Sequence, residues 1–141
     1  MKKISIVIMI FVGMGCSAPQ KEETNKETIK DLGEIMIDLK AYHQNIGDYL
    51  VRGQLKDTEW LIDGMDSTLH LAIAKYAEHP KLTGSFESFY NELLAQPMLD
   101  IKANVKANKK EAAIQSFILL TDNCNSCHKK HEVRKRVKFK P

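Results

Sequence analysis

Apolar residues recur at helical spacing along most of this chain. The first stripe repeats at positions i, i+3, i+4 and i+7 and predicts a helix that begins near Thr28, with charged residues largely off the stripe. A second helix is predicted from about Thr58 to Glu78, because the following His79 precedes a proline and resists the helical conformation. The two stripes are Ile29, Leu32, Ile35, Met36, Leu39, His43 and Ile46, and then Leu61, Met65, Leu69, Ala72, Ile73 and Tyr76.

Two further helices are predicted in the second half of the chain. The third begins at Ser85, a suitable N-cap, and is expected to kink or split at Pro97. The last runs from about Lys110 to Val133, and the sequence shows no strand-like alternation longer than a few residues, no repeat and no glycine-rich phosphate loop. Four helices joined by short linkers predict an all-α fold, an antiparallel four-helix bundle. The inward positions are Phe86, Phe89, Tyr90, Leu93, Leu94, Leu99, Ile101 and Val105, and then Ala113, Ile114, Phe117, Ile118, Leu120, Thr121 and Cys124.

The N-terminus reads as an export signal. Lys2 and Lys3 precede an uncharged apolar run that is too short for a transmembrane helix. The run ends in Gly13-Met14-Gly15-Cys16, which resembles the lipobox of bacterial lipoproteins, although that family prefers leucine where this chain has Gly13. The resemblance implies that residues 1–15 are a lipoprotein-type signal peptide and that Cys16 is acylated. Ordinary secretion with cleavage near Ala18 is the alternative.

The segment after the signal is expected to connect a membrane to the folded domain. Residues 16–27 are polar and read as a flexible tether. Ser17, rather than aspartate, follows the cysteine, which in lipoproteins implies the outer membrane. The expected location is therefore the periplasm, on a bacterial membrane through the N-terminal lipid.

Length and charge limit the remaining possibilities. The chain has 141 residues and a net charge of +3, which leaves room for one domain with one apolar core. The basic residues gather from Lys129 to the end of the sequence, where there are seven of them and a single acid, Glu132. These are Lys129, Lys130, Arg134, Lys135, Arg136, Lys138 and Lys140. Such a tail can steer an acidic redox partner, hold a haem propionate or meet an anionic membrane, and a solvated tail is equally compatible with it. No nucleic-acid partner is expected.

One motif carries specific chemistry. Cys124-Asn125-Ser126-Cys127-His128 is the haem-attachment pattern C-x-x-C-H. Two intervening residues place the sulfurs nearly one helical turn apart on one face, where they can form thioethers to the two porphyrin vinyl groups. His128 then projects beneath the ring as the proximal iron ligand. The motif predicts one haem c per chain, in a haem-binding domain at residues 28–136 followed by a basic tail at 137–141.

Three other interpretations of the cysteine pair stay open. A zinc site could use Cys124, Cys127, His128 and His131, although there is no second cysteine pair. A thioredoxin-like redox pair would need a preceding strand in a βαβ context. A disulfide between residues three apart is strained in a helix.

The arrangement of these features resembles a known family. A four-helix bundle with C-x-x-C-H in the last helix is similar to the class II cytochromes c, the cytochrome c′ and low-spin cytochrome c-556 group, whereas class I members place the motif near the N-terminus. The resemblance covers roughly Thr28 to Arg136. The family often has an aromatic residue followed by a basic one after the proximal turn, where this chain has His131 and Glu132. Bundles of this family often dimerise through their first two helices, so the resemblance makes a homodimer a further expectation.

The same resemblance implies which residues are candidates for the sixth iron ligand. Low-spin family members use a methionine of the first helix, and Met36 lies on the apolar stripe in a similar setting; core filling is the alternative role for it. His43 lies two turns later, about 10 Å along the axis, and is the less favoured ligand. Methionine ligation predicts a non-enzymatic electron carrier with an unidentified redox partner. The runner-up is a high-spin, five-coordinate haem protein that binds NO or CO, and a peroxidase is a third possibility without an identifiable distal acid–base pair.

Overall fold

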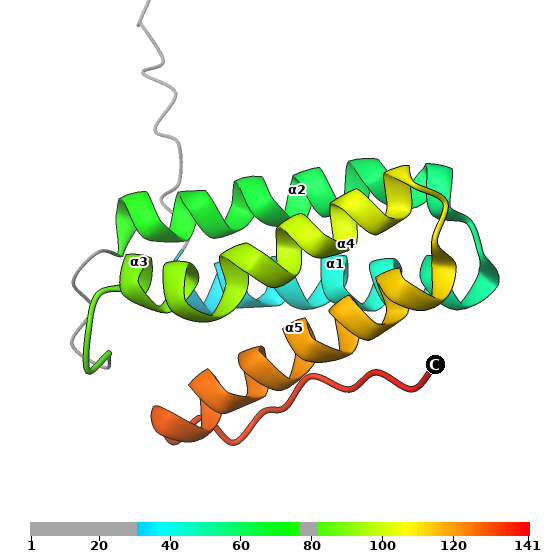
Figure 1. The fold of residues 1–141 in the computed structure, drawn as a ribbon. Helices are drawn as coiled ribbons and strands as arrows, with labels where there is room; N and C mark the ends of the chain where they lie inside the picture. Colours follow the sequence, from blue (N-terminus) through cyan, green and yellow to red (C-terminus); the bar gives the residue numbers. More distant parts are fainter. Residues whose placement is uncertain (1–30, 77–81) are drawn as a thin grey trace, which may run out of the picture.

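The computed structural model describes residues 31–76 and 82–141, and all regular structure in them is helical. The expected signal peptide, the lipid-attachment site Cys16, the tether and His79 lie outside these residues. The second helix ends at Lys75, before the stop that was predicted at His79. The all-α prediction is confirmed for the described part, in which the helices pack against one another (Figure 1). The elements are α1 (Leu32–Arg52), α2 (Leu55–Lys75), α3 (Phe86–Phe89), the π-helical η1 (Tyr90–Leu94), α4 (Ala95–Lys106) and α5 (Lys110–Lys130).

The first helix begins at a capping box rather than near Thr28. The Asp31 carboxylate accepts a hydrogen bond from the Glu34 amide at 2.8 Å, and the Glu34 carboxylate accepts one from the Asp31 amide at 3.2 Å. These bonds satisfy amides that have no partner within the helix. At the other end Gly53 adopts a left-handed conformation, with φ of 73°, and closes the helix.

The second helix begins earlier than its polar residues suggest. Thr58 was expected near the start, but it is fully buried inside α2, and its hydroxyl donates to the Gln54 carbonyl at 2.8 Å. A threonine can bond the carbonyl four residues back without leaving the helix, so it need not mark a cap. The turn formed by Gly53 and Gln54 therefore leads directly into α2 at Leu55.

The third predicted helix is interrupted, as Pro97 implies. Ser85 is its N-cap, and the Ser85 hydroxyl accepts from the Ser88 amide at 3.1 Å. A π-helical turn, η1, separates α3 from α4, which contains Pro97. A proline clashes with the carbonyl four residues back and has no N–H to donate to it. For Pro97 that carbonyl belongs to Leu93, and the wider π-helical turn avoids the clash.

Apolar side chains from α1, α2, α4 and α5 form one core. α1 packs against α2, α2 against α4, and α4 against α5. None of the helices in residues 31–76 and 82–141 combines the length and apolar character that a membrane crossing requires. The largest fully buried apolar side chains of the core are Phe117, Ile35, Ile46, Leu50, Leu61, Ile62, Ile101 and Leu120.

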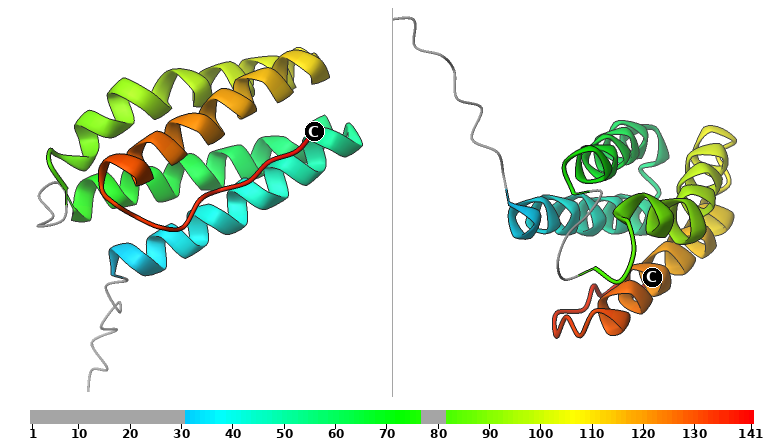
Figure 2. Two further views of the ribbon diagram at one scale, coloured as in Figure 1. Left: turned by 90° about the horizontal axis from the view of Figure 1, so that it is seen from below. Right: turned by 90° about the vertical axis from the view of Figure 1, so that its left-hand side faces the viewer.

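The chain does not end with α5, which stops at Lys130 rather than Val133. Residues 133–141 are extended and return along the molecule between α5 and α1 (Figure 2). Near the end of this segment, the Phe139 ring meets Phe117 of α5 at 4.8 Å, centroid to centroid, and also approaches Gly47 of α1. We call residues 133–141 the C-terminal strap.

Candidate functional site

The C-x-x-C-H motif lies entirely within α5, close to its C-terminal end. Cys124, Cys127 and His128 are all half-buried, and both cysteines are free thiols. Cys124 also packs against the apolar core. The two sulfurs therefore belong to one turn of a regular helix, which is the spacing that thioether attachment to one porphyrin edge requires.

The surroundings of the two thiols keep them protonated. Burial raises the pKa of Cys124 to about 12, and Cys127 adds to this shift. Burial also raises the pKa of Cys127, against a smaller opposite effect of Lys130. Redox-active cysteines instead have a lowered pKa, which a helix N-terminus helps to provide. A pair near the C-terminus of a helix, with raised pKa values, is unlike a thioredoxin-type centre.

The His128 imidazole is held through one of its two nitrogens. Its Nδ1 lies 3.0 Å from the Lys135 carbonyl oxygen of the C-terminal strap. Because a carbonyl can only accept, the bond places the ring proton on Nδ1 and leaves the Nε2 lone pair free. Burial lowers the pKa of His128, with the Lys135 bond opposing and Arg136 adding to the shift, so the ring tends to be neutral. A neutral imidazole with its second nitrogen bonded to a carbonyl is the usual form of a metal-ligating histidine.

His131 does not join the cysteines in a metal-binding group. Its ring meets the Phe89 ring edge-on at 4.9 Å, and both of its nitrogens are buried without a hydrogen-bond partner. Lys130 lies over the same Phe89 ring at 4.9 Å. Among residues 31–76 and 82–141, no three His, Cys, Asp or Glu side chains are grouped to hold a metal ion.

The buried side chain of His43 contacts α5. It is 2% exposed, and its Nε2 lies 2.8 Å from the Thr121 hydroxyl. Since that hydroxyl donates to the Phe117 carbonyl at 2.8 Å, it accepts from His43, and Nε2 therefore carries the proton. Burial lowers the pKa of His43 to about 4, and its Nδ1 is buried with no partner.

The contact between His43 and Thr121 fixes the register of α1 against α5. Thr121 contacts His43, whereas Phe117, four residues earlier in α5, reaches Gly47, four residues later in α1, so these two helices run in opposite directions. Met36 lies seven residues before His43, and His128 lies seven residues after Thr121. Seven residues correspond to about two turns and about 10 Å, with a rotation of only about 20°. Met36 and His128 therefore each lie about two turns from this contact, toward the start of α1 and toward the end of α5.

Sequence patterns did not identify the residues that hold the strap and the interrupted helix. Asn125, within the motif, bonds Val137 twice: its amide nitrogen donates to the Val137 carbonyl at 3.0 Å, and its oxygen accepts from the Val137 amide at 2.9 Å. Asn123 donates to the Leu93 carbonyl at 2.6 Å. The alternation of Val137 and Phe139 with basic residues was a signal of a packed extended segment.

The residues of the motif fit a covalently bound haem. Two neutral thiols one turn apart are the groups that form thioethers to vinyl carbons, and the adjacent Nε2 lone pair is a nitrogen ligand for iron. α5 presents these thiols and this imidazole nitrogen together. The described residues do not group them with further side chains in a way that would hold a metal ion directly through thiolates.

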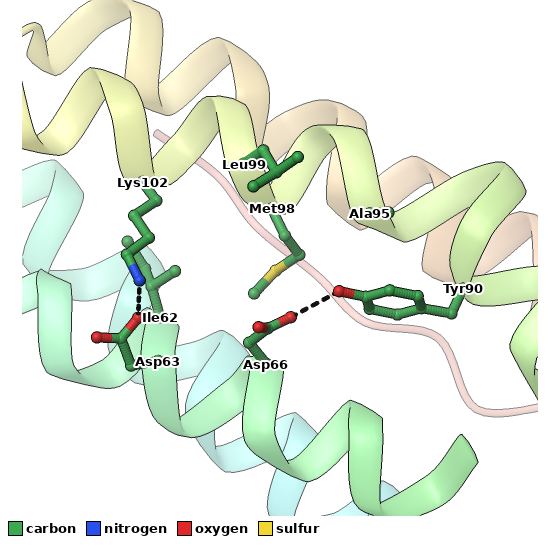
Figure 3. Close-up of a pocket in the computed structure, with 8 residues that line it drawn as sticks. All are labelled: Ile62, Asp63, Asp66, Tyr90, Ala95, Met98, Leu99 and Lys102. Carbon is green, nitrogen blue, oxygen red and sulfur yellow. Dashed lines mark hydrogen bonds and ion pairs between the residues drawn. The ribbon is translucent and has the colours of Figure 1, made fainter. Parts of the chain in front are cut away.

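A small pocket elsewhere has a packing role. It has a volume of about 80 Å³ and lies between α2 and the η1–α4 segment (Figure 3). Its polar groups pair with one another: the Tyr90 hydroxyl donates to Asp66 at 2.8 Å, and Lys102 donates to Asp63. Burial and Asp66 raise the pKa of Tyr90 to about 12. Ligand sites usually exceed about 300 Å³, so this pocket is no candidate for a porphyrin.

No protein-family model, no curated protein and no solved structure matches this chain. A functional proposal must therefore rest on the residues and their geometry.

Proposed function

We propose that this protein is an exported monohaem c-type cytochrome that transfers electrons. Cys124 and Cys127 would hold one haem c through thioethers, and His128 and Met36 would ligate its iron. The observation that supports the electron-transfer assignment is the register of α1 and α5, in which Met36 and His128 each lie about two turns from the contact between His43 and Thr121. His43 is the weaker ligand candidate, because its Nε2 is bonded to Thr121 about two turns away.

Each residue has a separate part in this proposal. Bound haem c supplies a one-electron iron couple. The two cysteines fix the porphyrin edge to α5, and the imidazole of His128 donates through Nε2. The thioether of Met36, a softer donor than imidazole, would be the second iron ligand and would favour the reduced state of the iron. A site saturated in this way exchanges electrons without binding a substrate at the metal.

The fold proposal is an antiparallel four-helix bundle similar to the class II cytochromes c. Its support is the all-helical packing, the opposite directions of α1 and α5, and the position of the motif in the last helix. A homodimer belongs to the same proposal.

We also propose that Cys16 carries lipid and that residues 16–27 tether the domain to the periplasmic face of a bacterial membrane, where an unidentified redox protein is its partner. The support is the leader pattern together with the haem motif, since this kind of attachment occurs outside the cytoplasm. The variant Cys16→Ser should move from the membrane fraction to the soluble fraction. A native protein already found in the soluble fraction would refute the anchor.

Spectroscopy of the holoprotein tests the ligand set. Native ferric protein should be low-spin, with the weak far-red charge-transfer band of methionine ligation. Met36→Leu keeps the side-chain volume but removes the sulfur, so the band should vanish and the iron should become high-spin and open to CO. Met65→Leu, which alters a buried methionine of α2, is the matched control and should keep the native spectrum.

Two results would contradict the assignment. An unchanged low-spin spectrum in Met36→Leu would exclude this ligand and direct attention to His43. A native protein that is already high-spin and binds CO or NO would instead support the five-coordinate, gas-binding function.

A further inference from the structure

The reversal of the chain after α5 is built into the helix end. Glu132 adopts a left-handed conformation, with φ of 56°. The Glu132 amide donates to the Lys129 carbonyl at 3.2 Å, and the Val133 amide donates to the His128 carbonyl at 2.8 Å. This pair of bonds is the Schellman motif, which satisfies the last carbonyls of a helix and turns the chain back. The C-terminal strap therefore starts from a fixed direction.

A side chain of the motif itself then holds the strap. Asn125 brackets the backbone of Val137: it donates to the Val137 carbonyl at 3.0 Å and accepts from the Val137 amide at 2.9 Å. An amide side chain paired in this way reproduces the pairing between neighbouring strands. The strap is thereby tied to α5 within the C-x-x-C-H segment.

A third anchor lies farther along the strap. The Phe139 ring rests edge-on against Phe117 and directly over Gly47, where a Cβ atom would lie 2.8 Å from Phe139 Cδ2. Only glycine leaves room for the ring at this point of α1. The neighbouring Lys138 and Lys140 are exposed, whereas Val137 and Phe139 are half-buried, so the strap has an inner apolar edge and an outer basic edge.

These three anchors fix the position of the Lys135 carbonyl. It lies between the Schellman turn and the Asn125 bracket, and it is the group 3.0 Å from His128 Nδ1. Ligating histidines are oriented, and made stronger donors, by a carbonyl or carboxylate at the nitrogen that does not bind the metal. A carbonyl from a free tail could not do this, because its orientation would fluctuate.

We infer that the C-terminal strap is a positioning device for the axial imidazole: Asn125 and Phe139 seat the strap so that the Lys135 carbonyl holds His128 with Nε2 directed at the iron. This inference rests on the proposed haem function. Lys135 acts through His128 and is a positioning residue. Because a stronger imidazole donor stabilises the ferric state, the strap lowers the reduction potential.

The test uses full-length holoprotein and three variants. Asn125→Ala removes the bracket, Gly47→Ala displaces the Phe139 ring, and the double variant removes both anchors. Ser126→Ala is the matched control, since Ser126 is an exposed neighbour of Asn125 in the same helix. Trypsin cleavage at the basic residues of the strap reports whether the strap has been released.

Release of the strap should raise the reduction potential. We expect a shift of about tenfold in the ferric–ferrous equilibrium, which is about 59 mV for a one-electron couple, in the double variant and a smaller rise in each single variant. Ser126→Ala should keep the native potential and the native resistance to trypsin. A merely structural role would change unfolding without moving the potential.

Two failures can be told apart. If the native chain carries no covalent haem by mass spectrometry, the proposed function itself is wrong. If haem is attached in every variant and the double variant has a trypsin-sensitive strap but an unchanged potential, the positioning role is wrong while the cytochrome assignment stands. A double variant whose strap stays trypsin-resistant would also overturn the inference, because the named anchors would then not be what holds it.

Discussion

A single buried histidine makes the stability of this protein depend on pH. His43 is 2% exposed, donates to Thr121 and leaves its Nδ1 without a partner. Protonation of Nδ1 would bury a positive charge with no acceptor for the new N–H, and burial accordingly lowers the pKa of His43 from 6.5 to about 4. The folded state therefore resists a proton that the unfolded chain accepts.

The sign of the effect follows from this difference. Between pH 6.5 and about 4 the unfolded state binds the proton and the folded state does not, so stability falls as the pH falls through this window. His43 should cost the folded state about 3 kcal/mol at the lower limit relative to neutral pH. Chemical denaturation at several pH values, compared between the native chain and His43→Leu, measures this term by difference.

The substitution gives a clean comparison because Thr121 keeps the Phe117 carbonyl as its acceptor when His43 is gone. The free energy of unfolding of His43→Leu should therefore change less between the two pH limits than that of the native chain. Equal pH dependence of the two proteins would show that His43 is not buried in this way.

At this scale the sequence identifies candidate residues but not their roles. Met36 and His43 lie on one apolar stripe, and periodicity gives no reason to choose between them. What separates them is the bond from His43 to Thr121, which joins residues 78 positions apart and belongs to the packing of two helices. The C-x-x-C-H motif, by contrast, is local in sequence and could be recognised without the structure.

At the interruption between η1 and α4, a side chain of α5 supplies the hydrogen bond that Pro97 cannot make. Pro97 cannot donate to the Leu93 carbonyl, and Asn123 of α5 supplies a donor at 2.6 Å. This bond ties the π-helical turn to the helix that carries the C-x-x-C-H motif, one residue before Cys124.

Removal of the Asn123 donor should lower the stability of the protein measurably. Asn123→Ala should lower the free energy of unfolding by about 1 kcal/mol, because the half-buried Leu93 carbonyl loses its partner. Asn91→Ala, which changes an exposed asparagine of η1, is the control and should be close to neutral. Thermal or denaturant unfolding of the two variants provides the comparison.

A double variant identifies the cause. Alanine at position 97 restores an N–H that can reach the Leu93 carbonyl, so Asn123→Ala should cost less in a Pro97→Ala background. If the cost is the same in both backgrounds, the Asn123 side chain does not compensate for the proline.

Helix existence was predictable from periodicity, whereas helix ends depend on particular polar bonds. Asp31 and Glu34 are three residues apart in the sequence, which is the spacing of a capping box. The apolar stripe, however, begins with Ile29 and therefore predicted a start of the first helix near Thr28. Thr58 suggested a start for α2, because its burial cannot be known before the helices pack. The effect of Pro97 was predictable, although the π-helical form of the interruption was not.

At the scale of the whole molecule, the C-terminal strap contacts both α1 and α5, and no sequence pattern connects these segments. The sequence predicts only a basic tail at residues 137–141, since charge dominates the composition from Lys129 onward. Their ordering depends on a glycine of α1 and an asparagine of α5, neither of which is near them in sequence. The same fold leaves the basic side chains on the outer edge, where they can raise association rates with an acidic redox protein at low salt.

The most direct test of the central proposal is the intact mass of the mature chain, produced in bacteria together with a haem-maturation system and then denatured. We expect one haem per chain to remain bound after denaturation, and we expect it to be absent from the double variant Cys124→Ala/Cys127→Ala. A native chain whose mass is that of bare polypeptide, with both thiols open to alkylation or holding zinc, would contradict the proposal.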